Sequence, residues 1–196
     1  MRSFTTISLL ATVALVSAAS VPLERRASSA DTTNIMLHAY GTGAAGTIGG
    51  TQLMYADGNA IIGQQAPSNA SVVSNVTFSF NGSSAPIGVS PTTSNTTAPT
   101  SMSLYINTGS DSFDSVSLSN STPGENYTDT GFVFFGDWLM WVGSDGTLQS
   151  KFHAAPTGED GSWSLKWNSA DTEDSTGIPV SLRSIAPSSD DLDRKA

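Results

Sequence analysis

Few residues in this chain have the chemistry needed for catalysis. It contains two histidines, His38 and His153, and no cysteine. A Ser-His-Asp unit needs a histidine base, and the sequence lacks the G-x-S-x-G turn that often presents the nucleophile. Both histidines fall in segments that alternate like β-strands, so we interpret them as strand residues. The carboxylates Asp171, Glu173 and Asp174 lack EF-hand spacing and are interpreted as solvated loop residues. The sequence therefore predicts no metal site and no cofactor.

Carboxylates leave one catalytic alternative open. Glycoside hydrolysis needs two carboxylates across a sugar site. Asp137 lies in the most apolar run of the chain, and the other acids available are the loop residues Glu125, Glu159 and Glu173. A polysaccharide-active hydrolase would use Asp137 with one loop glutamate. The competing interpretation is that Asp137 is a turn residue following Gly136, and we favour a protein that is not an enzyme.

Aromatic side chains make binding the simpler hypothesis. A sugar site needs a flat aromatic face and a few hydrogen-bonding groups. The candidates for contact with a glycan or a protein partner are Tyr40, Trp138, Trp141, Trp163 and Trp167. Trp163 and Trp167 share one face of an alternating segment, and the alternative for both is core packing. Trp138 and Trp141 have opposite parity, so at most one of them points into a single-sided core.

Alternation of apolar and polar residues is the main structural signal. The clearest strand-like segments are 34–40, 51–56, 59–62, 71–80, 102–106, 131–142, 147–153, 162–167 and 178–185. Turn signals separate them, including Asp57-Gly58 and the run 143–146. The sequence predicts an all-β protein, an antiparallel sandwich or barrel of about nine strands.

Three segments need separate interpretation. The glycine-rich stretch 41–50 separates the first two strand-like segments. The Ser/Thr/Pro-rich stretch 83–100 is expected to be a long loop, with a short strand around 87–89 as the alternative. The run 131–142 is expected to be a central strand covered on both faces, and the hairpin from Phe132 to Phe152 is expected to be the centre of the core.

The two ends of the chain carry processing signals. Residues 1–19 combine Arg2, a short apolar run and small residues, which is typical of a secretory signal peptide. Residues 20–26 end in Arg25-Arg26, the pattern of a propeptide site, which predicts a mature chain starting at Ala27. The domain is expected to cover 27–187, and 188–196 to be a disordered polar tail.

Glycosylation signals and net charge limit the classes of partner that we expect. Six N-x-S/T sequons occur, at Asn69, Asn75, Asn81, Asn95, Asn120 and Asn126, and they predict a glycoprotein. The formal charge of −9 argues against nucleic acid. No apolar run after the signal peptide is long enough for a membrane span.

Taken together, the dibasic site and the sequons resemble small secreted fungal glycoproteins with a kexin-type propeptide, of the wall-associated or effector and elicitor type. That resemblance implies an extracellular or cell-wall location. We expect a non-catalytic glycoprotein that binds a cell-wall polysaccharide or a host extracellular protein. The alternatives are the hydrolase considered above and a purely structural cell-wall protein.

Overall fold

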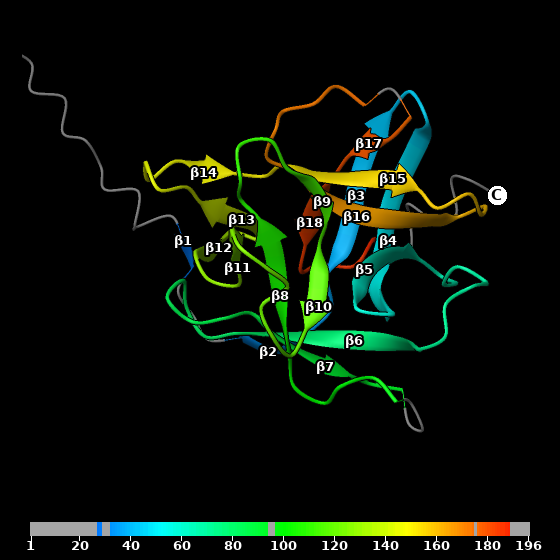
Figure 1. Ribbon diagram of the computed structural model, residues 1–196, viewed down its shortest axis with the longest axis horizontal. Coiled ribbons are helices and arrows are strands. Elements are labelled where there is room, and N and C mark those ends of the chain that lie inside the picture. Colours follow the sequence, from blue (N-terminus) through cyan, green and yellow to red (C-terminus); the bar gives the residue numbers. More distant parts are fainter. Residues whose placement is uncertain (1–26, 29–31, 94–96, 175, 189–196) are drawn as a thin grey trace, which may run out of the picture.

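The computed structural model describes residues 27–28, 32–93, 97–174 and 176–188, and these residues form strands, turns and loops without a helix. Figure 1 shows the arrangement. The strands are β1 (Ala27–Ser28), β2 (Thr32–Ile35), β3 (His38–Gly43), β4 (Gly46–Ala56), β5 (Asn59–Gly63), β6 (Val73–Phe80), β7 (Gly88–Pro91), β8 (Met102–Asn107), β9 (Phe113–Ser115), β10 (Ser117–Ser119), β11 (Tyr127–Thr128), β12 (Phe132–Phe135), β13 (Trp138–Val142), β14 (Leu148–Gln149), β15 (Phe152–Pro156), β16 (Ser162–Asn168), β17 (Ile178–Pro179) and β18 (Ser181–Arg183).

Six strands close into a barrel. Around it, β4 pairs with β6, β6 with β7, β7 with β8, β8 with β10, β10 with β5, and β5 with β4. Every one of these pairs is antiparallel. Closure leaves the barrel strands without a free edge between them. The predicted all-β antiparallel architecture is therefore confirmed, with a closed barrel at its centre.

Two series of paired strands extend outward from β4 and β5 of the barrel, and two short strands pair with other barrel strands, β2 with β6 and β11 with β8. Residues 46–52 of β4 pair with β3, and residues 53–56 pair with β5, so this long strand belongs to two sheets. Beyond β3 lie β18, β13 and β12 in that order. On the other side β5 pairs with β16, which pairs with β15. The β3–β18–β13–β12 extension carries the surface described below.

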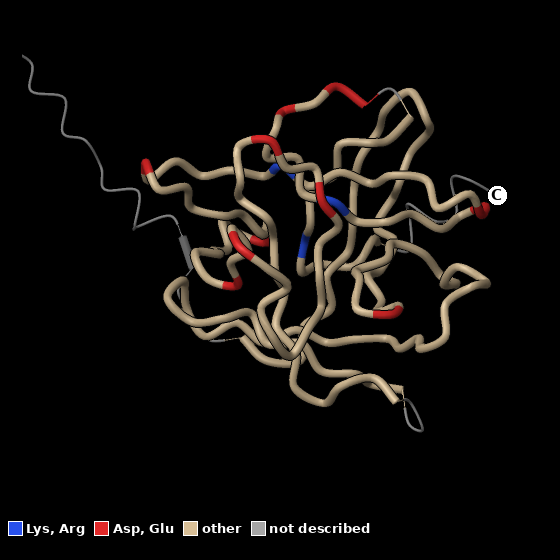
Figure 2. Tube along the Cα trace, viewed as in Figure 1, with Lys and Arg blue, Asp and Glu red and all other residues tan. Residues whose placement is uncertain are grey.

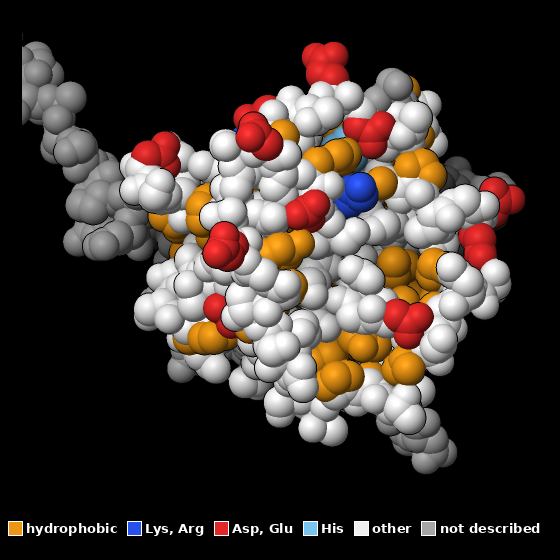
Figure 3. All heavy atoms as spheres, viewed as in Figure 1, with side chains coloured by type: hydrophobic (Ala, Val, Ile, Leu, Met, Phe, Trp, Pro, Cys, Tyr) orange, Lys and Arg blue, Asp and Glu red, His pale blue; other side chains and the backbone are white. Residues whose placement is uncertain are grey.

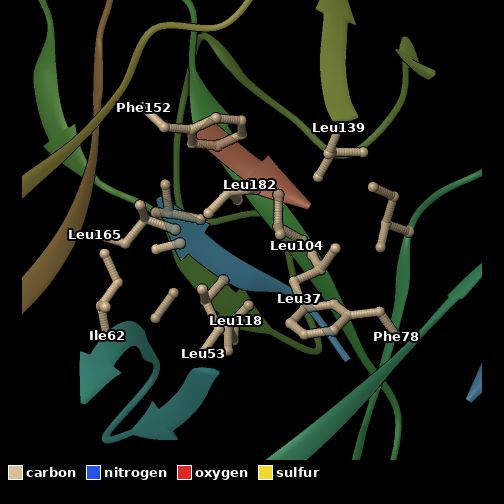
Figure 4. Close-up of a cluster of buried hydrophobic side chains, with 14 of the residues drawn as sticks. Leu37, Leu53, Ile62, Phe78, Leu104, Leu118, Leu139, Phe152, Leu165 and Leu182 are labelled. Carbon is tan, nitrogen blue, oxygen red and sulfur yellow. The ribbon is translucent and has the colours of Figure 1, made fainter. Parts of the chain in front are cut away.

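One apolar cluster fills the interior. In Figure 4, side chains from strands distant in the sequence converge, among them Leu53 of β4, Phe78 of β6 and Leu165 of β16. Each of these three is at most 1% exposed. Burying a large apolar side chain stabilises a fold by about 1.5–3 kcal/mol. The chain has no cysteine, so disulfides contribute nothing to its stability.

Two sequence predictions about local structure are confirmed. Asp57 and Gly58 have φ of 46° and 88° and join β4 to β5, as expected of a two-residue turn with both central residues at positive φ. In β6, Val76, Phe78 and Phe80 are buried, whereas Asn75 on the opposite face is exposed. Alternation thus predicted correctly which face of β6 meets the core.

The prediction of one central strand over 131–142 is wrong. The segment is a hairpin in which Phe135 pairs with Trp138 across a two-residue turn, and Gly136 has φ of 65°. Glycine adopts that φ without steric cost, so the apolar run can reverse there. Because the chain reverses at this turn, the alternation counted for one continuous strand does not carry across it. Phe134 pairs with Leu139, and both side chains are buried.

The hairpin is buried on one face and only partly covered on the other. Phe132, Phe134 and Leu139 are buried in the main cluster, as is Phe152 farther along the chain. The other face is more open, with Trp138 exposed. The Phe132 to Phe152 region therefore contributes to the core, but the expectation of two covered faces is wrong.

Other strand boundaries also differ from the prediction. The glycine-rich stretch 41–50, which the sequence analysis did not assign to a strand, belongs mostly to β3 and β4, which pair down to Gly43 and Gly46. The 178–185 segment is split at Val180 into β17 and β18. Within 83–100, β7 forms close to the alternative position at 87–89. Such breaks explain why the described strands outnumber the nine expected.

Charged side chains lie mostly away from the barrel interior. Figure 2 shows acidic residues on the loops around the trace, while the few basic residues lie nearer its middle. No helix that could cross a membrane occurs in the ranges that the structure describes. The segments predicted to be a signal peptide (1–19) and a propeptide ending in Arg25 and Arg26 (20–26), and residues 189–196, lie outside these ranges.

Candidate functional site

The candidate site is a surface on the outer face of three neighbouring strands. Trp138 of β13 pairs with Arg183 of β18, and β18 pairs in turn with β3, which carries Tyr40. Their neighbours Leu139, Leu182 and Ala39 are buried. Because successive side chains point to opposite faces of a strand, Trp138 and Arg183 point outward together. We call Tyr40, Asp137, Trp138 and Arg183 the aromatic patch.

Arg183 lies between two aromatic rings. Its guanidinium carbon is 4.9 Å from the centroid of the Trp138 ring and 5.2 Å from that of Tyr40. Both distances allow a cation–π interaction. The Tyr40 hydroxyl donates a hydrogen bond of 2.9 Å to the carbonyl of Ile185, which fixes that ring. The patch is therefore held in place before any ligand arrives.

Asp137 balances the charge of the arginine. The Nε of Arg183 donates a hydrogen bond of 2.6 Å to Oδ2 of Asp137, and the terminal nitrogen contacts the same oxygen. Asp137 is half-buried in the turn that precedes Trp138. A close arginine–carboxylate contact orients both groups. The patch consequently presents polar groups without a net charge.

Trp138 is the exposed aromatic residue of the patch. This side chain is 41% exposed, one of the few large hydrophobic residues so open among the described ones. An indole ring can stack on the apolar face of a sugar ring, and neighbouring polar groups can bind hydroxyls. On the face shown in Figure 3, hydrophobic side chains are scattered among polar atoms and acidic groups. Single exposed hydrophobic residues are common on protein surfaces, and Trp138 differs from them in having the paired Arg183 and Asp137 beside it.

The other aromatic candidates do not join this patch. Trp167 is fully buried and packs edge-on against Phe152 at 4.9 Å, so the core-packing alternative applies to it. Trp163 is half-buried and packs against the same cluster. Trp141 is half-buried, and its Nε1 donates a hydrogen bond of 3.1 Å to the carbonyl of Thr130. Of the five candidates, the structure brings Tyr40 and Trp138 together at the surface.

Two of the acids considered for the hydrolase alternative, Asp137 and Glu159, are engaged by neighbouring groups. Asp137, the best-placed acid, is engaged by Arg183 and occupies the turn position of the competing interpretation. Among the loop glutamates, Glu159 accepts hydrogen bonds from the backbone N–H and hydroxyl of Ser68, which lower its pKa. A general acid for glycoside hydrolysis needs a raised pKa instead.

The sequon asparagines are accessible where the structure describes them. The five described ones are exposed: Asn69, Asn75, Asn81, Asn120 and Asn126. The sixth, Asn95, lies outside the described residues. Exposure is what N-linked modification requires, and the modification itself stays a prediction.

Arg183 is the member of the aromatic patch that sequence reasoning missed. Arg183 belongs to the polar face of the last alternating segment, 178–185. That position indicated that its side chain points away from the core. Its partner Asp137 is 46 residues away in the chain.

Comparison with protein families, with curated proteins and with solved structures finds no match for this chain. The functional argument therefore depends on the geometry of the patch.

Proposed function

We propose that this protein is a secreted, non-catalytic glycoprotein that binds a cell-wall polysaccharide through the aromatic patch. The observation that carries the proposal is the exposed Trp138 ring, held beside the Arg183–Asp137 pair. The indole stacks on a sugar ring, and the paired side chains contact its hydroxyls. Because Asp137 compensates the charge of Arg183, we expect the ligand to be a neutral polysaccharide.

Net charge supports the same ligand class. The chain has 17 acidic and 8 basic residues. A protein with this excess of negative charge repels polyanions such as acidic polysaccharides. A neutral glucan, xylan or chitin has no such penalty, and its flat sugar faces suit an aromatic ring.

The experiment compares binding of the secreted protein to insoluble β-glucan, xylan and chitin with binding of Trp138→Ala. We expect the substitution to weaken binding about 30-fold or more, since aromatic anchors typically contribute at least ~2 kcal/mol. Tyr127→Ala, which removes an aromatic ring from β11, is the matched control and should bind like the parent protein.

Two other results would support one of the alternative functions instead. Release of reducing sugar from any of the three polysaccharides would support the hydrolase, provided that Asp137→Asn abolishes it. If the parent protein binds none of them but binds host extracellular protein in a Trp138-dependent manner, the same patch serves the host-surface alternative. Equal binding by the parent and Trp138→Ala would refute the patch as the site.

A further inference from the structure

A cavity of about 440 Å³ lies beside the aromatic patch, where residues of β3, β4 and β6 come together with the end of β5. Its volume is within the range of small-molecule sites, about 300–1,000 Å³. Its polar side chains are those of His38, Thr51, Gln52, Gln64 and Asn75. Among the described residues, no Asp, Glu, Lys or Arg lines it. The lining therefore suits a neutral ligand that both donates and accepts hydrogen bonds.

Strand register connects this cavity to the aromatic patch. Trp138 of β13 pairs with Arg183 of β18, and Arg183 pairs on its other side with His38 of β3. His38 pairs in turn with Gln52 of β4. Directly paired side chains lie on the same face of a sheet, so these residues form one row across four strands. Figure 1 shows β18, β3 and β4 side by side. Trp138 and His38 are thus two strand spacings apart, about 10 Å.

A β-bulge at Gly50 orients the ring of His38. The pairing of β3 with β4 shifts between Ala39 and Tyr40, and Gly50, with φ of 86°, is the extra residue. The carbonyl of Gly50 is 3.1 Å from Nδ1 of His38. Because a carbonyl can only accept, Nδ1 carries the proton and donates it to this hydrogen bond. Nε2 of the neutral ring is therefore an acceptor.

Nε2 of His38 is a polar group in need of a partner. His38 is 8% exposed, and none of the described residues donates a hydrogen bond to Nε2. This nitrogen is nevertheless not one of the fully covered atoms that lack a partner in the described part of the chain. It therefore remains accessible from the cavity that His38 lines. Buried polar groups without a partner are uncommon, and a ligand hydroxyl would supply one here.

Two glutamines and an apolar residue complement the imidazole. Gln52 is half-buried and Gln64 is exposed, and neither side chain has a hydrogen-bond partner among the residues described. Each carboxamide offers both donors and an acceptor, as binding of sugar hydroxyls requires. Met54, which is buried, adds apolar surface to the lining. Hydroxyls around an apolar ring face are the features of a sugar that such a lining can bind.

We propose that this cavity is a second subsite for the polysaccharide and holds one neutral sugar unit. Nε2 of His38 accepts a hydrogen bond from one hydroxyl, and the carboxamides of Gln52 and Gln64 bind its neighbours. The polysaccharide chain runs across β18 and β3, from the Trp138 ring to the cavity. This inference rests on the proposed polysaccharide binding, and it adds the direction of the bound chain.

Asn75 gives the cavity a second source of the same chemistry. It lines the cavity and belongs to the sequon Asn75-Val76-Thr77. An N-linked glycan on Asn75 would begin at the cavity and compete with a free chain for it. Thr77→Ala removes the sequon but keeps Asn75, whereas Thr77→Ser keeps the sequon. Comparing these two variants with the parent protein separates the two sources of sugar.

The experiment measures binding of soluble oligosaccharides to the secreted protein by titration calorimetry. The probes are the hexasaccharides and disaccharides of β-glucan, xylan and chitin, with a galacturonate hexasaccharide as the charged comparison. A disaccharide, whose two rings are adjacent, reaches only one of the two positions. We expect one of the neutral hexasaccharides to bind Thr77→Ala at least about tenfold more tightly than its disaccharide. The galacturonate hexasaccharide should not bind.

Two substitutions in the Thr77→Ala background test the cavity itself. Gln64→Ala should weaken binding of the hexasaccharide about fivefold, as expected for the loss of one neutral hydrogen bond. Gln65→Ala is the matched control, because Gln65 is also exposed but does not line the cavity. His38→Asn keeps a donor for the Gly50 carbonyl but removes the acceptor at Nε2, and it should weaken binding by a similar factor. Its melting temperature shows whether it folds, and Gln64→Ala decides the result if it does not.

The possible results separate this proposal from the proposed function. Hexasaccharide binding by Thr77→Ala, but not by the parent or Thr77→Ser, would support a sugar site that the protein's own glycan fills. Equal affinities of Gln64→Ala, Gln65→Ala and their Thr77→Ala parent would overturn the second subsite, as would equal binding of the galacturonate hexasaccharide. If Trp138→Ala still abolishes binding in that case, the proposed function stands alone. If none of the oligosaccharides binds Thr77→Ala, the subsite is refuted, and binding to the insoluble polysaccharides decides the proposed function separately.

Discussion

The two faces of the β12–β13 hairpin are built from similar residues but are held in different ways. The inner face packs Phe132, Phe134 and Leu139 into the main cluster, with Phe134 edge-on to Phe80 at 5.3 Å. The outer face holds Trp138 through a cation and its carboxylate partner. Apolar burial therefore stabilises one face, and directional polar contacts arrange the other. The difference implies that side chains on the outer face can be replaced without unfolding the protein.

The largest effect is expected on the inner face. Phe134→Ala should destabilise the fold by about 3–5 kcal/mol, because it removes a buried ring and leaves a cavity. The matched control is Phe135→Ala, the same change one residue later on the half-buried outer face. Denaturant unfolding of both variants measures the contrast. Equal losses of stability in the two variants would contradict the difference between the faces.

Trp138→Ala should cost less stability, about 1–2 kcal/mol, because the ring is 41% exposed. Typical domains have about 5–15 kcal/mol of stability, so the variant stays folded. Polysaccharide binding should nevertheless be lost. A variant that unfolds like Phe134→Ala would place Trp138 in the core instead of a binding surface.

Gly136→Ala tests the turn that separates the two faces. With φ of 65° and open space around the new Cβ, the cost is conformational, about 1 kcal/mol. Gly124→Ala, in an exposed loop without positive φ, is the control and should change the melting temperature little. An unaffected melting temperature in Gly136→Ala would show that this φ is not required.

The smallest effect is expected for Arg183→Lys. Lysine keeps the charge but loses the planar group between Trp138 and Tyr40, which should cost about 0.5 kcal/mol. Lys151→Arg, at an exposed ion pair, is the reference for a conservative change of a basic residue. If polysaccharide binding persists while the melting temperature falls, Arg183 supports the fold and does not position Trp138.

Sequence reasoning succeeded where a local rule applies. The Asp57-Gly58 turn and the buried face of β6 followed from dihedral preference and alternation. It failed over 131–142, because Gly136 allows a reversal that an apolar run gives no reason to expect. It assigned no strand to 41–50, because glycine is depleted in strands, yet these residues pair in β3 and β4.

For the candidate site, the sequence alone determined the residue types: an all-β chain poor in catalytic groups, with tryptophans on alternating segments and a negative net charge. The tertiary structure decided which tryptophan is exposed and what surrounds it. Alternation assigns a residue to a face, but it does not determine which strands pair or in which register. Arg183 reaches Asp137 and Trp138 only because β18 lies between β3 and β13. That contact depends on the pairing of strands far apart in the chain, which no local pattern encodes.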